Sequence, residues 1–400
     1  MNDKPPSAVL AKGALARDEG LARIHLLRSP NIGPVTYAQL LRRFGDARAA
    51  LEALPELAAR GGMGRKAARY RPVTRAEIED EVAAVKLLGA RYIFHDGPEY
   101  PPLLRQVEGA PPILIVRGEA ALARRSPVAL VGARNASAGA ARLARDFAQA
   151  LSEAGHAVVS GLARGIDAAA HRGALAGQAK GAGVGTIAVI AGGIDVAYPP
   201  ENAELQEEIA ASGLLITEQP PGVEPQTRHF PARNRIIAAL AVGTVVVEAA
   251  PRSGSLITAR LASDFGREVM AIPGSPLDPR SHGCNELIRE GAVLVQSVAD
   301  VIELVTSFDG VPRSGFREDE ADAYDFGPEE VAADAWPVDD GGDEAVMAIV
   351  EGLLSSAPVA VDELIRQSGA AAADVQMALI ELELAGGLIR HAGGRVSRAV

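Results

Sequence analysis

The chain has 400 residues, enough for roughly two to four domains at about 100–200 residues each. Hydrophobic residues make up 48% of the chain and charged residues 23%, as in a globular protein with a sizeable core. The single cysteine, Cys284, excludes an intramolecular disulfide framework and a cysteine-based zinc site. The N-terminal region lacks an apolar signal segment, and the longest apolar stretch, residues 236–247, is too short to span a bilayer. We therefore expect a cytoplasmic protein.

The net charge of −11 is concentrated in one segment of the chain. Residues 308–344 hold 13 acidic and two basic residues, so the remainder of the chain is neutral. The acidic balance therefore does not exclude a nucleic-acid partner for the folded parts. Arginine supplies 35 of the 40 basic residues, which is typical of a GC-rich genome, although arginine is also the better bidentate phosphate ligand.

The first part of the chain is predicted to be a small helical domain. Residues 1–19 are expected to be disordered, and apolar residues at helical spacing over residues 21–60 predict helices in a domain of residues 20–75. The turn Asn31-Ile32-Gly33-Pro34 resembles the turn of a helix-hairpin-helix or SAM-like module, which can present backbone N–H groups to a phosphate. A plain helical hairpin used for packing is the simpler interpretation of the same turn.

Residues 76–307 alternate short apolar runs with helical segments. The predicted strands are residues 128–131, 157–160, 186–191, 214–218, 244–248, 268–272 and 293–295. Strands that alternate with helices of ten or more residues form parallel βαβ units. Several of these strands are apolar throughout, as expected when helices cover both faces of the sheet. The sequence therefore predicts an α/β domain with a Rossmann-like, doubly wound, mostly parallel sheet.

The end of the chain predicts a linker and a third domain. Residues 308–342 are acidic, rich in proline and glycine, and without periodicity, which indicates a disordered linker. Three helices and a small hairpin in residues 343–400 form a winged-helix pattern. The third helix, predicted at residues 374–385, is bare of arginine and lysine, whereas a helix that reads a DNA groove is usually basic. We favour protein contact over duplex DNA binding for this domain.

The residues that follow the predicted strands point to an anionic ligand. In an open parallel sheet, ligands bind beyond the carboxyl ends of the strands. The residues at those ends are Gly132, Arg134, Asn135, Ser160, Gly161, Arg164, Gly165, Asp195, Arg252, Ser253, Gly254 and Ser255. Glycines allow close backbone approach, and the Ser-Gly-Ser motif opens a predicted helix whose free N–H groups suit a phosphate.

Four arginines are expected along this edge of the sheet. Arg134 and Arg164 lie just past strand ends, while Arg233 and Arg235 flank Asn234 at the start of a predicted helix over residues 236–241. One phosphate does not need so many arginines, but a row of phosphates does. Lys180 and Arg252 are weaker candidates for the same role.

Other residue patterns have a structural and a functional interpretation. The glycines at 181, 183 and 185 resemble a dinucleotide-binding loop but precede a strand instead of opening a helix, so we expect no cofactor there. Asp167 and His171 could form an acid–base pair, but we favour Asp167 as a helix cap and His171 as a contact to a neighbouring residue or to the ligand. Glu218 and Glu248 could be paired catalytic carboxylates; without a nucleophile or a metal cluster, we interpret them as hydrogen-bonding and arginine-orienting groups.

Several sequence blocks, taken in order, resemble the bacterial DNA-processing protein A family (DprA, also called Smf). They are YPPLL at 100–104, VALVGAR at 128–134, VSGLARGID at 159–167, GGID at 192–195, FPARNRII at 230–237 and SGSLIT at 253–258. Each block is moderately specific, and all of them in this order are highly specific. The resemblance covers about residues 95–300, and the flanking domains resemble the longer members of the family.

The resemblance implies a single-stranded DNA-binding protein and not an enzyme. It implies an extended Rossmann-like domain that dimerises, protects incoming DNA and delivers the recombinase RecA to it during natural transformation. Carried over by motif, the strand lies across Gly132, Arg134, Ser160, Gly161, Arg164, Gly165, Arg233, Asn234 and Arg235. Two positions depart from the family pattern: Pro200 stands where lysine is common, and Ala133 where serine is common.

Two rival functions remain at this point. Rossmann-like relatives with glycine-rich edges hydrolyse nucleoside monophosphates to a base and ribose phosphate, and Glu218, Glu248, Arg134 and Arg164 could serve such an enzyme. The size of the ligand distinguishes the hydrolase from the single-strand binder, because an enzyme pocket needs to hold one phosphate and a strand-binding site needs to hold several. A pure scaffold, with the acidic linker and the winged helix as its working parts, is the third possibility.

Overall fold

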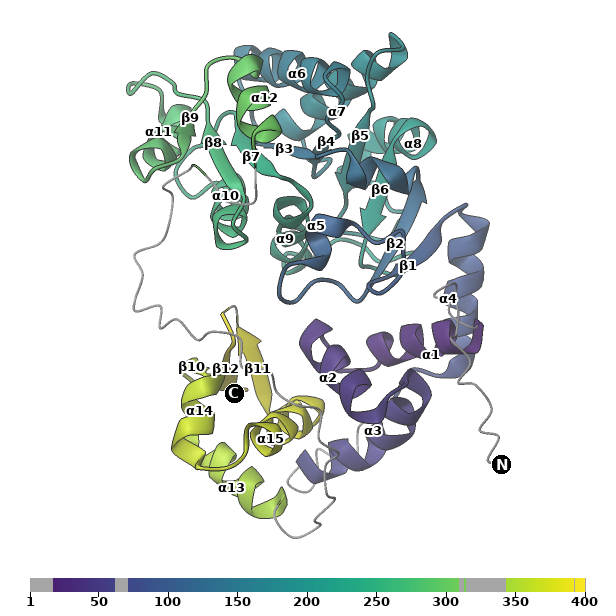
Figure 1. Cartoon of the computed structure of the whole chain (residues 1–400). Helices are drawn as coiled ribbons and strands as arrows, with labels where there is room; N and C mark the ends of the chain where they lie inside the picture. The colour runs from purple at the N-terminus through teal and green to yellow at the C-terminus, as the bar shows by residue number, and fades with distance from the viewer. Residues whose placement is uncertain (1–16, 62–70, 309–312, 314–342, 392, 400) are drawn as a thin grey trace, which may run out of the picture. The chain divides into compact units, whose positions relative to one another are not determined.

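The computed structural model describes residues 17–61, 71–308, 313, 343–391 and 393–399 (Figure 1). The predicted disordered linker falls almost wholly outside these residues, as does most of the predicted disordered N-terminus. Residues 17–19, which were included in that N-terminus, begin helix α1 (Arg17–Arg28). The chain forms two compact units: its middle part makes one, and its N-terminal and C-terminal parts together make the other.

The described residues of the middle unit form a nine-stranded sheet in the order β1-β2-β6-β5-β4-β3-β7-β8-β9. The seven predicted strands are confirmed as β3 (Val128–Val131), β4 (Val158–Ser160), β5 (Thr186–Val189), β6 (Leu214–Thr217), β7 (Gly243–Val246), β8 (Glu268–Ala271) and β9 (Val293–Leu294), all parallel to one another. The chain moves outward from β3 to β6 and then returns to place β7 beside β3. This reversal is the topological switch point at which open sheets of this kind bind ligands.

Two further strands, which the sequence analysis missed, extend the sheet beyond β6. β1 (Arg91–Phe94) pairs antiparallel with β2 (Ile113–Gly118), and β2 pairs antiparallel with β6. Because these strands are connected by a loop and the short helix α5 (Pro102–Arg105), they lack the strand–helix alternation that identified the others.

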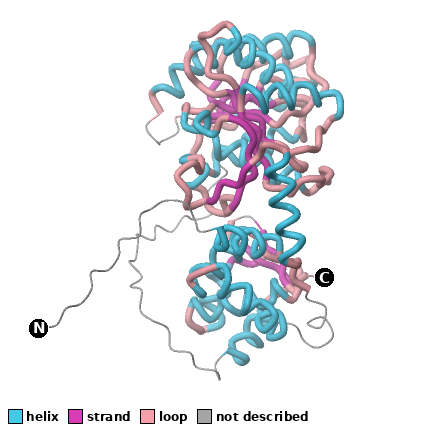
Figure 2. Tube along the Cα trace, turned by 90° about the vertical axis from the view of Figure 1, so that its right-hand side faces the viewer, coloured by secondary structure: helices cyan, strands magenta, loops and turns pink. Residues whose placement is uncertain are grey.

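Helices cover both faces of the sheet, as Figure 2 shows for the magenta strands and the cyan helices around them. Along β3, Val128 and Leu130 pack with one set of helices, and Ala129 and Val131 with the other, because successive side chains of a strand point to opposite faces. The first set includes α6 (Ala138–Glu153), α7 (Ile166–Ala179), α8 (Ala203–Ser212) and α12 (Val298–Thr306). The second includes α9 (His229–Leu240), α10 (Gly254–Asp264) and α11 (His282–Arg289).

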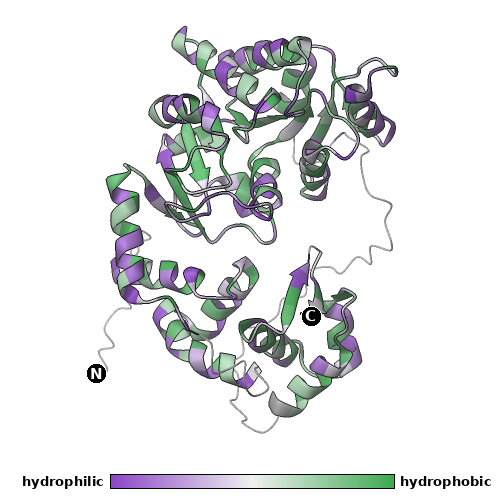
Figure 3. Cartoon of the chain, turned by 180° about the vertical axis from the view of Figure 1, so that it is seen from behind, coloured by the Kyte–Doolittle hydropathy of each residue, from purple (hydrophilic) through white to green (hydrophobic). Residues whose placement is uncertain are grey.

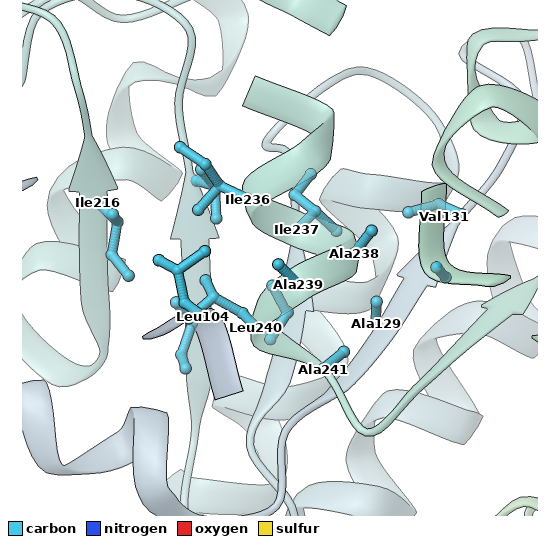
Figure 4. Close-up of a cluster of buried hydrophobic side chains, with 14 of the residues drawn as sticks. Leu104, Ala129, Val131, Ile216, Ile236, Ile237, Ala238, Ala239, Leu240 and Ala241 are labelled. Carbon is cyan, nitrogen blue, oxygen red and sulfur yellow. The ribbon is translucent and has the colours of Figure 1, made fainter. Parts of the chain in front are cut away.

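Helix α9 is anchored by its C-terminal half. Ile236, Ile237 and Leu240 are buried in the same cluster as Leu104 and Val131 (Figure 4). This packing fixes the axis of α9 against the sheet, so that the first turns of the helix reach the carboxyl ends of the strands.

The second unit combines α1, α2 (Pro34–Phe44) and α3 (Ala47–Gly61) with the predicted winged helix. The winged helix consists of α13 (Asp343–Leu353), α14 (Val361–Ser368), α15 (Ala372–Leu384) and a three-stranded sheet of β10 (Val359–Ala360), β12 (Arg395–Arg398) and β11 (Leu388–His391). The hydropathy colouring in Figure 3 shows that polar and apolar residues alternate along its helices, as they do along those of the middle unit. Helix α4 (Arg75–Leu87) leads into the middle unit, where Val85 is buried.

No helix among the described residues combines the length and the apolar character that a membrane span requires.

The close packing of α6 against α7 leads to a testable prediction. Gly173 of α7 faces α6, and a Cβ atom there would lie 2.1 Å from the carbonyl oxygen of Arg145. Gly173→Ala should therefore lower the free energy of unfolding by about 1–3 kcal/mol, even though alanine favours helix. The matched control is Gly139→Ala in α6, where a Cβ meets nothing within 4 Å, and which should be neutral or stabilising. Equal stability of the two variants in urea unfolding would contradict this account of the α6–α7 packing.

Candidate nucleic-acid interface

A cavity of about 390 Å³ opens at the carboxyl ends of β3, β4 and β5. Its lining comes from the loops after these three strands, from Pro225 in the loop between β6 and α9, and from the first turns of α9. The lining residues are Arg134, Asn135, Gly161, Ala163, Arg164, Ile190, Ala191, Gly192, Val196, Tyr198, Pro199, Pro200, Pro225, Phe230 and Arg233. The structure thus brings together Arg134, Asn135, Gly161, Arg164 and Arg233 from the predicted set.

The floor of the cavity depends on glycines in the loops after β3 and β4. A Cβ atom on Gly161 would lie 1.2 Å from Nη1 of Arg233, so only glycine lets this guanidinium pack against the loop. Gly165 adopts a φ of 72°, and a Cβ there would lie 2.2 Å from the carbonyl oxygen of Ala133. Gly132 also has no room for a side chain, because Ile166 lies against it. These glycines shape the floor by close backbone packing.

Asp167 holds the loop after β4 from below. Its Oδ2 accepts hydrogen bonds from the backbone N–H groups of Gly161 at 3.1 Å and Ala163 at 3.4 Å. The predicted helix cap is wrong in detail, because Gly165 occupies the N-cap position of α7 and Asp167 lies inside the first turn. Burial raises the pKa of Asp167, while the nearby Arg233 and the two N–H donors favour the charged carboxylate.

His171 supports the same loop one turn further along α7. The Thr186 hydroxyl donates to the carbonyl oxygen of Val158 at 2.7 Å, so it accepts from Nδ1 of His171 at 2.8 Å. Nε2 of the neutral ring is then free to accept from the N–H of Leu162 at 3.3 Å. Burial and the charges of Arg233 and Arg172 lower the pKa of His171 to about 3. His171 therefore contacts neighbouring residues. Its ring stabilises Leu162, a loop residue with the uncommon φ of 56°.

Arg233 is the most deeply buried charge at the cavity. Its side chain is 7% exposed, and its Nη1 lies 4.0 Å from Oδ2 of Asp167. Desolvation lowers the pKa of Arg233 to about 10, against the opposing effect of Asp167, so the group stays charged at neutral pH. Its Nε is buried and has no hydrogen-bond partner among the described residues. A buried, charged guanidinium with an unused donor is suited to an anion.

Arg235 does not join this site. The structure starts α9 at His229, seven residues before the predicted start, so Arg233 and Arg235 lie on the helix and point in directions roughly 200° apart. Arg235 donates to Glu218 at 2.5 Å and to the carbonyl oxygen of Gly109 at 2.6 Å. The predicted arginine-orienting role of Glu218 is confirmed, but the arginine that it orients serves the scaffold.

An aromatic pair stands beside Arg134 at the rim of the cavity. The rings of Tyr198 and Phe230 have centroids 5.6 Å apart and planes tilted by 51°. The guanidinium of Arg134 lies 5.2 Å from the centroid of the Phe230 ring, in the range of a cation–π contact. Tyr198 is 47% exposed, so an unstacked base can reach its ring.

Arg164 is held at the surface by a residue that the sequence analysis missed. Its Nε lies 2.6 Å from Oε1 of Glu201, and Nη2 donates to Oε2 at 2.7 Å. The adjacent Asn202 donates from Nδ2 to the carbonyl oxygen of Leu162 at 2.9 Å, which ties the two loops together. Neither contact has a sequence signal, because both depend on how the loop after β5 folds back over the loop after β4.

The other predicted residues lie around the cavity or away from it. Glu248 accepts from the backbone N–H of Ser137 at 3.0 Å and from its hydroxyl at 2.7 Å, which matches its predicted hydrogen-bonding role. Ser160 donates to Leu130 at 2.6 Å, and Asp195 accepts from the N–H of Gly222 at 2.8 Å. These contacts orient loops and helix ends without lining the cavity.

The Ser-Gly-Ser motif lies on the same edge of the sheet, beyond α9. Ser253 caps α10 by accepting from the N–H of Ser255 at 3.4 Å, and Asn234 donates to the carbonyl oxygen of Gly254 at 3.4 Å. Arg252 precedes this cap, with a φ of 65°. The predicted phosphate position at α10 is thus next to α9 but outside the described cavity lining.

Lys180 is far from the site, contrary to the prediction. It follows α7 at the end opposite to the cavity, and a helix of 14 residues separates the two by about 20 Å. It lies 3.8 Å from Glu153 instead. Pro200 lines the cavity at the position where the family commonly has lysine, but proline carries no charge for a phosphate. Lys180 lies too far from the cavity to supply that charge.

Three family models match the chain. The family model described as DNA recombination-mediator protein A matches residues 91–306. Models described as a DprA-like N-terminal HHH domain and a DprA winged helix domain match residues 17–84 and 337–394.

The chain belongs to the DNA recombination-mediator protein A family. Protein Smf of Escherichia coli is 35% identical over 338 residues, which cover 83% of this chain and 84% of that protein. A putative DNA processing protein DprA of Mycobacterium tuberculosis is 40% identical over 284 residues, covering 67% of this chain and 70% of that protein. Protein Smf of Synechocystis is 41% identical over 228 residues, but the match spans only 55% of that protein.

A solved member of the DprA family has the same fold. The structure of DNA processing protein A from Streptococcus pneumoniae is 38% identical and superposes with a TM-score of 0.62. It covers 71% of this chain, and 97% of that chain is matched. The Rossmann-like sheet and its flanking helices are therefore shared with this relative.

The buried His171 predicts a specific pH dependence of stability. Because the folded pKa of about 3 lies below the unfolded value of about 6.5, stability is full above pH 6.5 and is lost as pH falls toward 3. Between pH 7 and pH 5, the native chain should lose about 2 kcal/mol more than His171→Gln, whose amide does not titrate. Urea unfolding at both pH values measures the difference. Equal losses for the two proteins would show that His171 is not a neutral support of the loop.

Proposed function

We propose that this chain binds single-stranded DNA across the cavity and its arginine rim and carries out no chemistry on it. The observation that carries the proposal is the juxtaposition of two kinds of group. Arg233 offers a buried donor for a phosphate, and Arg134 with Phe230 and Tyr198 offers a stacking surface for a base within the same lining.

Single strands fit this arrangement better than a duplex. Bases of a single strand can turn their faces toward aromatic rings, whereas bases of a duplex are stacked on each other. The cavity volume is near the lower end of the range for small-ligand pockets, about 300–1,000 Å³, so it suits roughly one nucleotide. The rest of the strand would continue over the rim, toward Asn234 and the Ser-Gly-Ser motif on one side.

The geometry favours a binder over a nucleotide hydrolase. Glu218 and Glu248, the candidate catalytic carboxylates, contact Arg235 and Ser137 and are not among the described residues that line the cavity. Asp167 accepts two backbone hydrogen bonds below the floor and is 7% exposed, so it is poorly placed to act on a substrate.

Family membership supports a proposal for the biological role. We propose that the protein acts in the cytoplasm as a homodimer, protects incoming DNA and delivers RecA to it during natural transformation or recombination. A dimer would hold two DNA segments and gain avidity. These parts of the proposal rest on the family and not on a contact in the described residues.

Charge reversal at the rim should weaken binding strongly. Arg134→Glu should lower the affinity for a fluorescent single-stranded oligonucleotide at least tenfold, because it removes a phosphate partner and its contact with Phe230. Arg134→Ala should flatten the log–log salt dependence by about 0.7. Lys180→Glu is the matched control, since the structure places this residue at the other end of α7. If Lys180→Glu weakened binding more than Arg134→Glu, the proposed site would be wrong.

The aromatic pair should contribute affinity without contributing to the salt dependence. Phe230→Leu keeps an apolar side chain but removes the ring, and stacking of one base is worth about 1–3 kcal/mol. We expect the dissociation constant to rise about tenfold at an unchanged salt slope in fluorescence anisotropy. An altered slope with unaltered affinity would contradict the assigned role. Release of free base from nucleoside monophosphates by the native chain would instead support the hydrolase.

A further inference from the structure

The third helix of the winged helix, α15, is buried on two sides. Val375, Leu379 and Leu382 pack into the core of the winged helix itself. Met377, Ile380 and Leu384 belong to a different cluster, which contains Leu40 of α2, Leu54 and Leu57 of α3, and Leu26 of α1. In helix-turn-helix folds the face of the recognition helix that points away from its own core enters the DNA groove. Here that second face is apolar and covered by the N-terminal helices.

Polar contacts at this interface are specific. Gln39 of α2 donates to Oε1 of Gln376 at 2.5 Å. Thr36 donates to Glu383, which also accepts from Arg390 of β11 at 2.8 Å. The Glu383 side chain is only 13% exposed, so its charge is neutralised within the interface and not by solvent.

Backbone packing brings α3 unusually close to α15. Gly61, the last residue of α3, faces the backbone of α15, and a Cβ atom there would lie 1.9 Å from the carbonyl oxygen of Glu381. Only a residue without a side chain allows this approach. The contact between α3 and α15 therefore depends on the glycine at position 61, although helix α3 could form with another residue there.

The turn before α2 is also engaged. Asn31 donates from Nδ2 to the carbonyl oxygen of Leu384, at the C-terminal end of α15. Glu383 and this turn line the same polar recess, with a volume of about 300 Å³. A carboxylate and the negative end of a helix dipole disfavour a phosphate at this turn.

We propose that the winged helix is a protein-docking module whose partner is the N-terminal helical domain of the same chain. Docking uses the face of α15 that a DNA-binding winged helix presents to the major groove. It also places the carboxylate of Glu383 and the C-terminal end of α15 at the hairpin turn, so neither surface is available to nucleic acid while the two are joined. This inference does not depend on DNA binding at the cavity of the middle unit.

Cross-linking tests the docking and its partner. Gln39→Cys and Gln376→Cys, introduced together in the full-length chain, should be joined by a short bismaleimide within one molecule, since the native Cys284 is buried. We expect monomers with both cysteines linked, identified by peptide mass spectrometry, and no such link in either single variant. A linked dimer would overturn the assignment to the same chain, and the absence of a link would overturn docking itself.

A second pair of variants separates docking from folding. Gly61→Leu, added to the two cysteines, should reduce the link at least tenfold, because its side chain collides with α15. Ala59→Leu places the same side chain at an exposed position of the same helix and should leave the link unchanged. Circular dichroism and single-stranded DNA binding should be the same for both. A Gly61→Leu protein that links as well as its control would overturn the proposal.

Discussion

The burial of the Arg233 guanidinium is the constraint around which the site is built. A charge that is 7% exposed needs a nearby counter-charge and close packing, and Asp167 and Gly161 supply them. Asp167 in turn accepts hydrogen bonds from the backbone of Gly161 and Ala163 in the loop after β4. His171 accepts one from Leu162, which lies between them. The cavity floor is thus a rigid assembly of an arginine, an aspartate, a neutral histidine and glycines, placed at the end of a sheet whose core is apolar.

The arginines at this edge divide into two groups with different roles. Arg235 is bound to Glu218 and a backbone carbonyl and stabilises the scaffold. Arg233 and Arg134 face the cavity, one buried and one at the rim beside an aromatic pair. Arg164 is intermediate, since its ion pair with Glu201 is exposed and would weaken in salt, leaving the guanidinium able to meet a phosphate. Binding would then combine one preformed anion position with a more adaptable rim.

Much of the fold could be predicted from the sequence because apolar residues recur at regular spacings within strands and helices. β3 was located at its actual bounds, and the parallel direction of the seven predicted strands followed from their alternation with helices. The convergence of residues 134, 161 and 164 followed from the rule that carboxyl ends of parallel strands share an edge, and residue 233 was expected there because it lies at the start of a predicted helix. β1 and β2 were missed because an antiparallel pair without a connecting helix has no such alternation. Arg235 was misplaced because the helix was predicted to begin after it, so the direction of its side chain on α9 could not be derived. Lys180 was misplaced although it precedes β5, and a loop that precedes a strand of a parallel sheet lies at the edge opposite to the ligand site.

The two accessory domains show a similar limit. The absence of basic residues on α15 led us to favour protein contact over duplex DNA binding, and the docking proposed above concerns the same helix. The identity of the covering surface required three-dimensional packing, because Gly61 and Gln39 carry no signal for a partner more than 300 residues away in sequence. The hairpin turn of residues 31–34, whose simpler interpretation was packing, indeed packs.

Hydrogen–deuterium exchange of the full chain with and without a single-stranded oligonucleotide tests the central claim most directly. The account predicts slower exchange in the loops after β3, β4 and β5 and in the first turn of α9. The turn between α7 and β5, at the other end of the sheet, should exchange at the same rate in both samples. Protection confined to that turn or to residues 343–399, with the cavity loops unchanged, would contradict it.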